Sequence, residues 1–403
     1  MHGFPHVFLA ALMALFFHPV ASRAGVADFD GEASVSAAST SNLFGDSTAQ
    51  DDTYTTAWLD LKLYPLSFAG VNLVGGYTYY GDFFNLSSLV YGGGLTLIPT
   101  SDSSRFSLYV NGTYRDREYR EPDSDSLSLN ANEFAGSEYE ATVAVGYKLT
   151  PTAEMRAGVS VTSIGYDLEG VNDRRRYDLT AGANVTLPGR FSIDLEGGYS
   201  NGKYQHIDPV VVVGGDTLPR RQILPGDQYT VLLEEDLQSI YISPRVSGPL
   251  GWKTAFSLTL SHRQFLDHNE ADVIYGYSTG YLSPWLTEFA GEAAVIRVKT
   301  YLIPRLIVTL TTGYWRREHI QTVESEWLLD RFGRPYRTVN LLYAQKRADR
   351  RRRLEVRVQW PLAMKPGLIV EPSLEVDYTD NNSTVRVYDH SSLNITGGLT
   401  VRF

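Results

Sequence analysis

Strict alternation of apolar and polar residues at the C-terminus limits the possible folds of this chain more than any other feature. The apolar set is Leu393, Ile395, Leu399, Val401 and Phe403, and the polar set between them is Asn394, Thr396, Thr400 and Arg402. Successive side chains of a β-strand point to opposite faces. The segment therefore predicts a strand with one apolar face and one polar face.

The two preceding segments repeat this pattern and place charges on the polar face. Leu354, Val356, Val358 and Trp360 alternate with Arg353, Glu355, Arg357 and Gln359. Val370, Leu374, Val376 and Tyr378 alternate with Glu371, Ser373, Glu375 and Asp377. The charged face is too polar for a protein core, and the other face is too apolar for water. A barrel wall between lipid and an aqueous lumen accommodates both faces.

The same alternation upstream predicts an all-β fold, a transmembrane antiparallel up-and-down barrel of about sixteen strands. We expect these strands near 31–41, 54–64, 71–80, 87–98, 105–115, 138–149, 153–165, 176–187, 191–203, 238–247, 254–265, 290–303, 305–316, 351–361, 367–378 and 392–403. Counts of fourteen or eighteen remain open. Residues 273–282 also look like a strand, which would make the number of wall segments odd. We assign 266–289 to a loop, since an odd wall count would separate the two termini.

The connectors between these strands are of two kinds. Each short connector contains a proline, and the prolines are Pro65, Pro99, Pro151, Pro188, Pro249, Pro304 and Pro361. Proline suits a turn because it fixes φ and cannot donate to a strand ladder. Long polar connectors alternate with the short ones. Short turns on the periplasmic side and long loops on the extracellular side are typical of outer-membrane barrels.

The N-terminal segment predicts export. Residues 1–24 are expected to be a signal peptide and 25–403 a single barrel domain. The apolar core Val7–Phe17 has the length of a signal-peptide core and is too short to span a bilayer as a helix. After residue 24 no apolar run of helical-span length remains, so a membrane protein of this sequence must be a closed barrel. The expected location is the outer membrane of a Gram-negative cell.

Aromatic residues fall where the predicted strands would cross the two membrane interfaces. Near the short turns these are Tyr64, Phe106, Tyr147, Phe191, Trp252, Trp360 and Phe403. Near the long loops they are Tyr79, Tyr114, Tyr166, Tyr177, Tyr199, Tyr314 and Tyr378.

The terminal segment Leu393–Phe403 resembles the C-terminal signal of Gram-negative outer-membrane proteins. In that class the barrel-assembly machinery reads a terminal aromatic residue and alternating apolar residues. The resemblance implies that Phe403 is an assembly signal and that this machinery is a partner. A second element, Ser41-Asn42-Leu43-Phe44, is similar to one in β-barrel porins associated with exopolysaccharide loci, although Gly45 stands where that family often has Arg.

If the alternation holds, the lumen carries charges of both signs. The first group is mainly acidic and contains Glu138, Glu140, Lys148, Glu154, Arg156, Asp194 and Glu196. The second is basic and contains Arg245, Arg263, Arg297, Lys299, Arg305, Arg353 and Arg357, after which Glu371, Glu375 and Asp377 return to acid. Facing arcs of opposite charge would orient a passing polar solute. The alternative is ladders of ion pairs, such as Arg353 or Arg357 with Glu371 or Glu375.

Other chemistries have little support in the sequence. The chain has no cysteine, which excludes disulfides, thiolate metal sites and a catalytic cysteine. Its formal net charge of −10 argues against nucleic acid as a partner. No histidine spacing typical of a metal site occurs, and we expect no metal or cofactor. A hydrolase using His262 or His268 remains an alternative, because a triad is recognised by geometry rather than sequence.

The leading prediction is a porin-like channel for passive diffusion of small polar or ionic solutes, with no enzymatic activity. The alternative is a barrel plugged by loop 116–137 or 204–237, with a structural, adhesive or polysaccharide-export accessory role. The second of these loops contains the apolar run Val210–Val213. Expected partners are outer-membrane lipid and lipopolysaccharide, and the run Arg350–Arg353 is interpreted as a rim that meets lipopolysaccharide phosphates.

Overall fold

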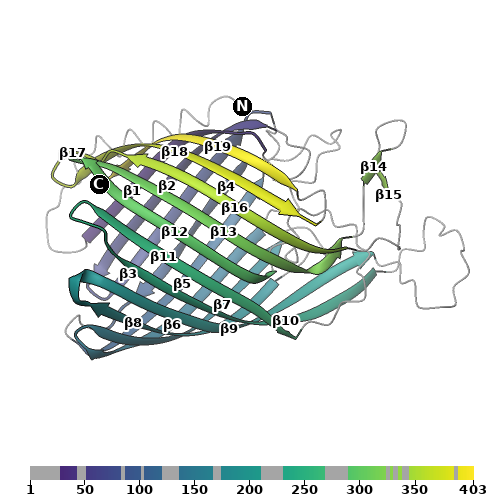
Figure 1. The fold of residues 1–403 in the computed structure, drawn as a ribbon, viewed down its shortest axis with the longest axis horizontal. Coiled ribbons are helices and arrows are strands. Elements are labelled where there is room, and N and C mark those ends of the chain that lie inside the picture. The colour runs from purple at the N-terminus through teal and green to yellow at the C-terminus, as the bar shows by residue number, and fades with distance from the viewer. Residues whose placement is uncertain are drawn as a thin grey trace, which may run out of the picture.

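The computed structural model describes residues 28–42, 51–82, 87–100, 104–119, 136–166, 174–209, 230–267, 289–323, 327–329, 335–337, 345–384 and 389–403. These residues form one closed antiparallel sheet and a small separate hairpin (Figure 1). The predicted signal peptide lies outside the described residues and stays a prediction.

The wall is built from strands that each pair with the next one along the chain. They are β1 (Asp28–Thr40), β2 (Asp52–Leu66), β3 (Ala69–Tyr80), β4 (Ser88–Leu97), β5 (Phe106–Tyr119), β6 (Gly136–Thr150), β7 (Ala153–Tyr166), β8 (Arg174–Leu187), β9 (Phe191–Pro209), β10 (Thr230–Pro249), β11 (Thr254–Asp267), β12 (Phe289–Ile303), β13 (Leu306–Val323), β16 (Gln345–Gln359), β17 (Leu362–Lys365), β18 (Leu368–Ser383) and β19 (His390–Arg402). The hairpin of β14 (Trp327–Leu329) and β15 (Pro335–Arg337) lies within the connection from β13 to β16.

The predicted count of sixteen wall strands is confirmed. β16 and β17 pair with β18 in one continuous register, so they are a single wall strand interrupted at Trp360-Pro361. The predicted turn at Trp360-Pro361 is therefore wrong. The chain turns instead at Pro366-Gly367, where Gly367 has φ 78°. Glycine adopts this left-handed conformation without the steric cost that a side chain would add.

The long connection from β9 to β10 is shorter than predicted. The two strands stay paired as far as Pro209 and Thr230, whereas the predicted loop covers the whole of 204–237. Residues 210–229, which include the apolar run Val210–Val213, lie outside the described residues, as do 120–135 and 268–288.

The barrel closes between its first and last strands. β1 pairs with β19 from Glu32 opposite Arg402 to Thr40 opposite Asn394. The short turns and the C-terminus share one end of the barrel, and the long connections leave from the other end (Figure 1). Among the described residues, no helix is long and apolar enough to cross a membrane.

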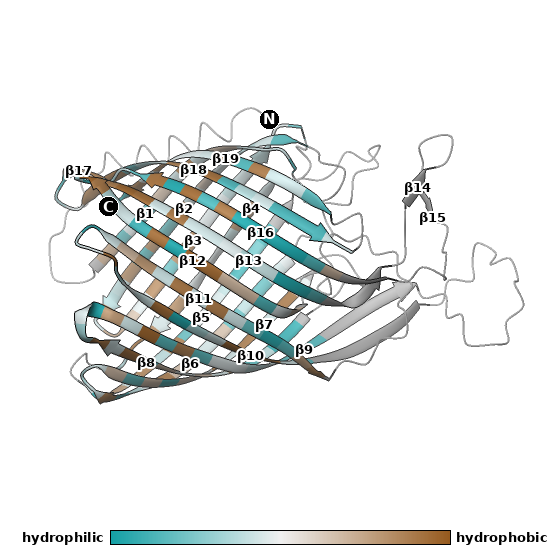
Figure 2. Cartoon of the chain, viewed as in Figure 1, coloured by the Kyte–Doolittle hydropathy of each residue, from teal (hydrophilic) through white to brown (hydrophobic). Residues whose placement is uncertain are grey.

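The outer face of the wall is apolar. Exposed large side chains alternate along each strand, for example Val143 and Val145 on β6, Ile240 and Ile242 on β10, and Leu354 on β16. Predicted interface aromatics on this face are exposed too, including Tyr64, Tyr147, Trp360, Tyr177, Tyr314 and Tyr378. The hydropathy colouring shows the brown positions recurring along the strands (Figure 2). An apolar outer band with aromatic borders is the surface of an outer-membrane barrel, and the protein is located in that membrane.

Candidate functional site

The strand register decides which side chains face the lumen. On β6 the exposed Tyr139, Val143 and Val145 point outward, so Glu138 and Glu140 point inward. The same test places most of the predicted lumen residues on the inner face, namely Glu154, Asp194, Glu196, Arg245, Arg263, Arg297, Lys299, Arg353, Arg357, Glu371 and Glu375.

Arg305 is the exception. It lies in the tight turn between β12 and β13, is exposed, and has φ 74°. The strand predicted near 305–316 begins at this residue, but β13 begins only at Leu306. Arg305 therefore belongs to the short-turn mouth of the barrel and not to the inner wall.

Arg156 on β7 binds two carboxylates on β9. Its Nη2 donates to Asp194 Oδ1 at 2.9 Å and to Glu196 Oε2 at 2.8 Å. The intervening strand β8 carries Gly182 directly opposite both Arg156 and Glu196. A Cβ atom at Gly182 would lie 3.1 Å from Arg156 Nε, so the missing side chain lets the guanidinium group cross β8. Tyr241 on β10 also donates to Glu196 Oε1, at 3.1 Å.

These contacts change the predicted acidic arc. Asp194 and Glu196 share one arginine, and Asn184 Nδ2 donates to Asp194 Oδ2 at 3.3 Å. An ion pair offsets the field that each carboxylate would otherwise project into the lumen. Of the predicted acidic residues, Glu138, Glu140 and Glu154 make no ion pair that the described residues show.

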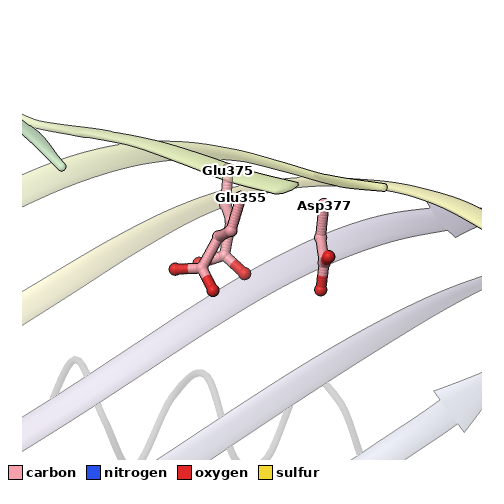
Figure 3. A group of neighbouring side chains, drawn as sticks. All are labelled: Glu355, Glu375 and Asp377. Carbon is pink, nitrogen blue, oxygen red and sulfur yellow. The ribbon is translucent and has the colours of Figure 1, made fainter. Parts of the chain in front are cut away.

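Strands β16 and β18 carry a second charged cluster. Arg353 Nε donates to Asp377 Oδ1 and Oδ2 at 3.0 and 2.9 Å, and its Nη2 lies 3.0 Å from Glu355 Oε2. Arg357 Nε lies 3.2 Å from Glu375 Oε2. Figure 3 shows the three carboxylates pointing to the same side of the wall. The pair Arg357–Glu375 is one of the ion pairs predicted as the alternative to a selectivity arc, whereas Arg353 pairs with Asp377 and Glu355 rather than with Glu371 or Glu375.

The three carboxylates of this cluster could in principle hold a cation. One oxygen atom from each of Glu355, Glu375 and Asp377 lies within 4.8 Å of the other two. Hard cations such as Ca²⁺ prefer oxygen ligands of this kind. However, each carboxylate already has an arginine partner in Arg353 or Arg357, and the two arginines offset two of the three negative charges without a metal ion.

The basic arc on β10 to β12 is different. Arg245, Arg297 and Lys299 point inward, and the described residues place no carboxylate in an ion pair with any of them. Arg263 is held by Ser239, whose Oγ accepts from Nε at 3.1 Å and from Nη2 at 3.0 Å. The arc is surrounded mainly by hydroxyl groups, including Ser243, Ser247, Ser257 and Thr259. Asp194 on β9 is directly opposite Arg245, but it makes its ion pair with Arg156.

Across the lumen from this arc, the inner face of β3 and β4 carries no charged residue. Opposite β10, however, β2 places Asp60 and Lys62 inward, with Lys62 Nζ 3.7 Å from Asp60 Oδ2. In a closed order of sixteen strands, β3 lies halfway round from β11. The inward positions of β3 and β4 include Asn72, Val74, Gly76, Thr78, Gly92, Gly94 and Thr96. The predicted acidic and basic arcs, on β6–β9 and β10–β13, are neighbours round the wall. They do not face each other across it, as a transverse field would require.

A group of polar contacts near the seam between β1 and β19 was not predicted from the sequence. Arg402 Nε lies 2.9 Å from Glu32 Oε2, and its Nη1 lies 3.2 Å from Glu371 Oε2. Gln359 Nε2 donates to Glu371 Oε1 at 2.6 Å. The alternation already put all these residues on the inner face, but only the register of β1 with β19 brings them together.

The predicted hydrolase histidine faces the wrong way for a lumen site. His262 is on the outward face of β11, where its Nδ1 lies 3.9 Å from Glu292 Oε1. Its cross-strand neighbours, Ile242 and Glu292, offer no hydroxyl nucleophile. His268 lies outside the described residues.

No family model matches the chain, and no curated protein matches it in sequence. Solved barrels are similar in shape. OccAB1 of Acinetobacter baumannii aligns over 94% of this chain and 97% of its own, with 11% identity and a TM-score of 0.47. The outer membrane protein OpdK of Pseudomonas aeruginosa aligns over 93% and 99%, with 11% identity and a TM-score of 0.42. CdiB of Acinetobacter baumannii aligns over 92% and 60%, with 8% identity and a TM-score of 0.48.

Proposed function

We propose that the protein is a channel for the passive diffusion of small polar or ionic solutes across the outer membrane. A closed wall of sixteen strands is wide enough to leave an aqueous passage unless something fills it. The inner face supports the proposal because it is lined by hydroxyl, amide and charged groups, which water and polar solutes can contact. Diffusion through such a passage needs no cofactor and no energy source.

Some basic side chains on the inner wall form ion pairs with carboxylates and others do not, and this contrast is the main support for the proposal. Arg156, Arg353 and Arg357 are bound to carboxylates, whereas Arg245, Arg297 and Lys299 are not in ion pairs within the described part of the chain. Free cations in a narrow passage attract anionic solutes and repel cations. We therefore assign charge selectivity to these three residues on β10 and β12.

Electrical recording tests whether the barrel conducts at all. Purified full-length protein added to a planar lipid bilayer should produce stepwise increases in current, each from one inserted barrel. A protein that inserts but gives no steps contradicts the proposed channel.

A deletion separates an open channel from a plugged one. Residues 210–224 include the apolar run Val210–Val213, which is the sequence feature that favours a plug. If the channel is open, removing 210–224 should leave the conductance nearly unchanged. A large increase in conductance on deletion would instead support the plugged barrel and its structural or accessory role.

A further inference from the structure

The run of four arginines on β16 is divided between the two faces of the wall. Arg350 and Arg352 are exposed and share the outward face with exposed Leu354. Arg351 and Arg353 alternate with them and point inward. Only the inward pair can act on a solute in the lumen. The outward pair stands on the surface that meets the membrane.

A third arginine on the neighbouring strand joins the outward pair. Arg316 of β13 is directly opposite Arg350, and Asn382 of β18 is opposite Arg350 on the other side. The side chain of Arg316 is 58% exposed. Like charges directly opposite each other in a sheet destabilise it. A negatively charged group beside Arg316, Arg350 and Arg352 would therefore stabilise this part of the sheet.

The protein supplies that group only in part. Glu318 Oε1 lies 3.0 Å from Arg316 Nη2, and Glu292 is the cross-strand neighbour of Arg316 on β12. Asp380 is opposite Arg352, but the described residues show no ion pair from any carboxylate to Arg350 or Arg352. Within the described part of the chain, two exposed guanidinium groups are thus available to an external anion.

The position of these arginines along the barrel indicates which anion they meet. Tyr314 is directly opposite Arg352, and exposed Tyr378 is opposite Leu354. Aromatic residues of this kind mark the level of the lipid headgroups. The arginines lie at or just beyond that level, at the long-loop end, where hydrophilic positions gather on β13, β16 and β18 (Figure 2). A second basic pair is found elsewhere on the outer face, where Arg175 is opposite Lys203. This pair also lies next to an outward-facing tyrosine, Tyr177, on its long-loop side.

We propose that Arg316, Arg350 and Arg352 form an outward-facing binding site for a phosphate group of a phosphorylated glycolipid in the outer leaflet, the class that includes lipopolysaccharide. Arginine offers several N–H donors in a fixed planar geometry and binds phosphate oxygens with charge-assisted hydrogen bonds. Asn382 adds an amide donor to the same row. This site is separate from the proposed channel, because it lies on the opposite face of the wall.

Native mass spectrometry of the full-length protein in detergent tests this site. The probes are lipid A with both phosphates, the same lipid with its phosphates removed, and inorganic phosphate. Wild-type protein should prefer the phosphorylated lipid by about tenfold or more, the effect expected for charge-assisted hydrogen bonds. The R350Q/R352Q variant should lose this preference, and R350K/R352K should keep part of it.

A matched control removes two arginines at the other end of the barrel. Arg190 and Arg305 lie in short turns with positive φ, which asparagine tolerates, so R190N/R305N should fold and keep the wild-type preference. Folding is checked by the difference in gel mobility between heated and unheated samples. If R350Q/R352Q does not fold, R316Q takes its place and should weaken the preference.

Three results would overturn the inference. One is an unchanged preference in the folded glutamine variant. Another is an equal loss in R190N/R305N, which would indicate general attraction between charges. The third is complete displacement of lipid A by millimolar inorganic phosphate, which would indicate a site for the free anion rather than the lipid.

Discussion

Gly31 and Phe403 exchange two backbone hydrogen bonds, from Gly31 N to Phe403 O at 2.8 Å and from Phe403 N to Gly31 O at 2.9 Å, and so close the barrel. The Phe403 ring covers the space that a Cβ atom at Gly31 would occupy. Phe29 flanks the same ring at a centroid distance of 5.9 Å. The terminal residue is thus packed into the seam between β1 and β19, in addition to its predicted role as an assembly signal.

Replacing Gly31 by valine should weaken this seam. The new side chain would overlap the Phe403 ring, and overpacking of this kind costs about 1–3 kcal/mol. We expect G31V to lower the temperature at which the folded barrel loses its fast gel mobility. The G75V variant is the control, since a Cβ atom at Gly75 meets nothing within 4 Å. Equal stability of G31V and wild type would contradict the packing described.

The Glu371 carboxylate should also stabilise the closure. Its side chain is only 6% exposed, and it binds Arg402 at 3.2 Å and Gln359 at 2.6 Å. Replacing it by leucine leaves the Gln359 amide without this partner and Arg402 with Glu32 alone. Buried polar groups left unsatisfied cost about 1–3 kcal/mol each. The loss should appear as a lower unfolding temperature for E371L, and a smaller loss is expected for E371Q, which keeps a hydrogen-bonding oxygen.

The bridge from Arg156 across Gly182 gives a prediction about selectivity. In G182V the new side chain would block the path of the guanidinium group to Glu196, leaving Glu196 without its arginine. We expect G182V and R156Q to shift the permeability ratio in the same direction, toward cations. The measurement is the reversal potential of single barrels under a salt gradient. Opposite shifts, or a shift in R156Q alone, would show that Arg156 does not need to cross β8.

The strands could be predicted from the sequence because the environment on each face of the wall is so different. Apolar and polar residues alternate strictly where lipid lies on one side and water on the other, as in Leu393–Phe403. The turn near Trp360 was predicted wrongly because the segment contains two prolines, Pro361 and Pro366, and either one could mark the turn. Proline at 361 only interrupts the strand ladder, and the turn forms where Gly367 supplies the positive φ.

The ion pairs of Arg156 could not be predicted because they depend on the register of the strands, which alternation does not give. Alternation placed Arg156 and Glu196 on the same face, but nothing in the sequence shows that Gly182 would stand between them. The position of Arg305 also could not be predicted, because alternation does not give the length of a turn. If the turn between β12 and β13 were one residue shorter, Arg305 would be the first residue of β13. Predicting the lumen therefore requires the pairing partner of each residue, which a single sequence does not contain.

We assign the charge selectivity of an open channel to Arg245, Arg297 and Lys299. The most direct measurement is the reversal potential of the R245E/R297E/K299E variant in a planar bilayer under a potassium chloride gradient. The control is R190E/R305E/K365E, which changes the same number of charges at the short-turn end of the barrel. We predict a severalfold shift of permeability toward potassium in the lumen variant and a much smaller shift in the control. Reversal potentials that are the same in the lumen variant and wild type would contradict the assignment.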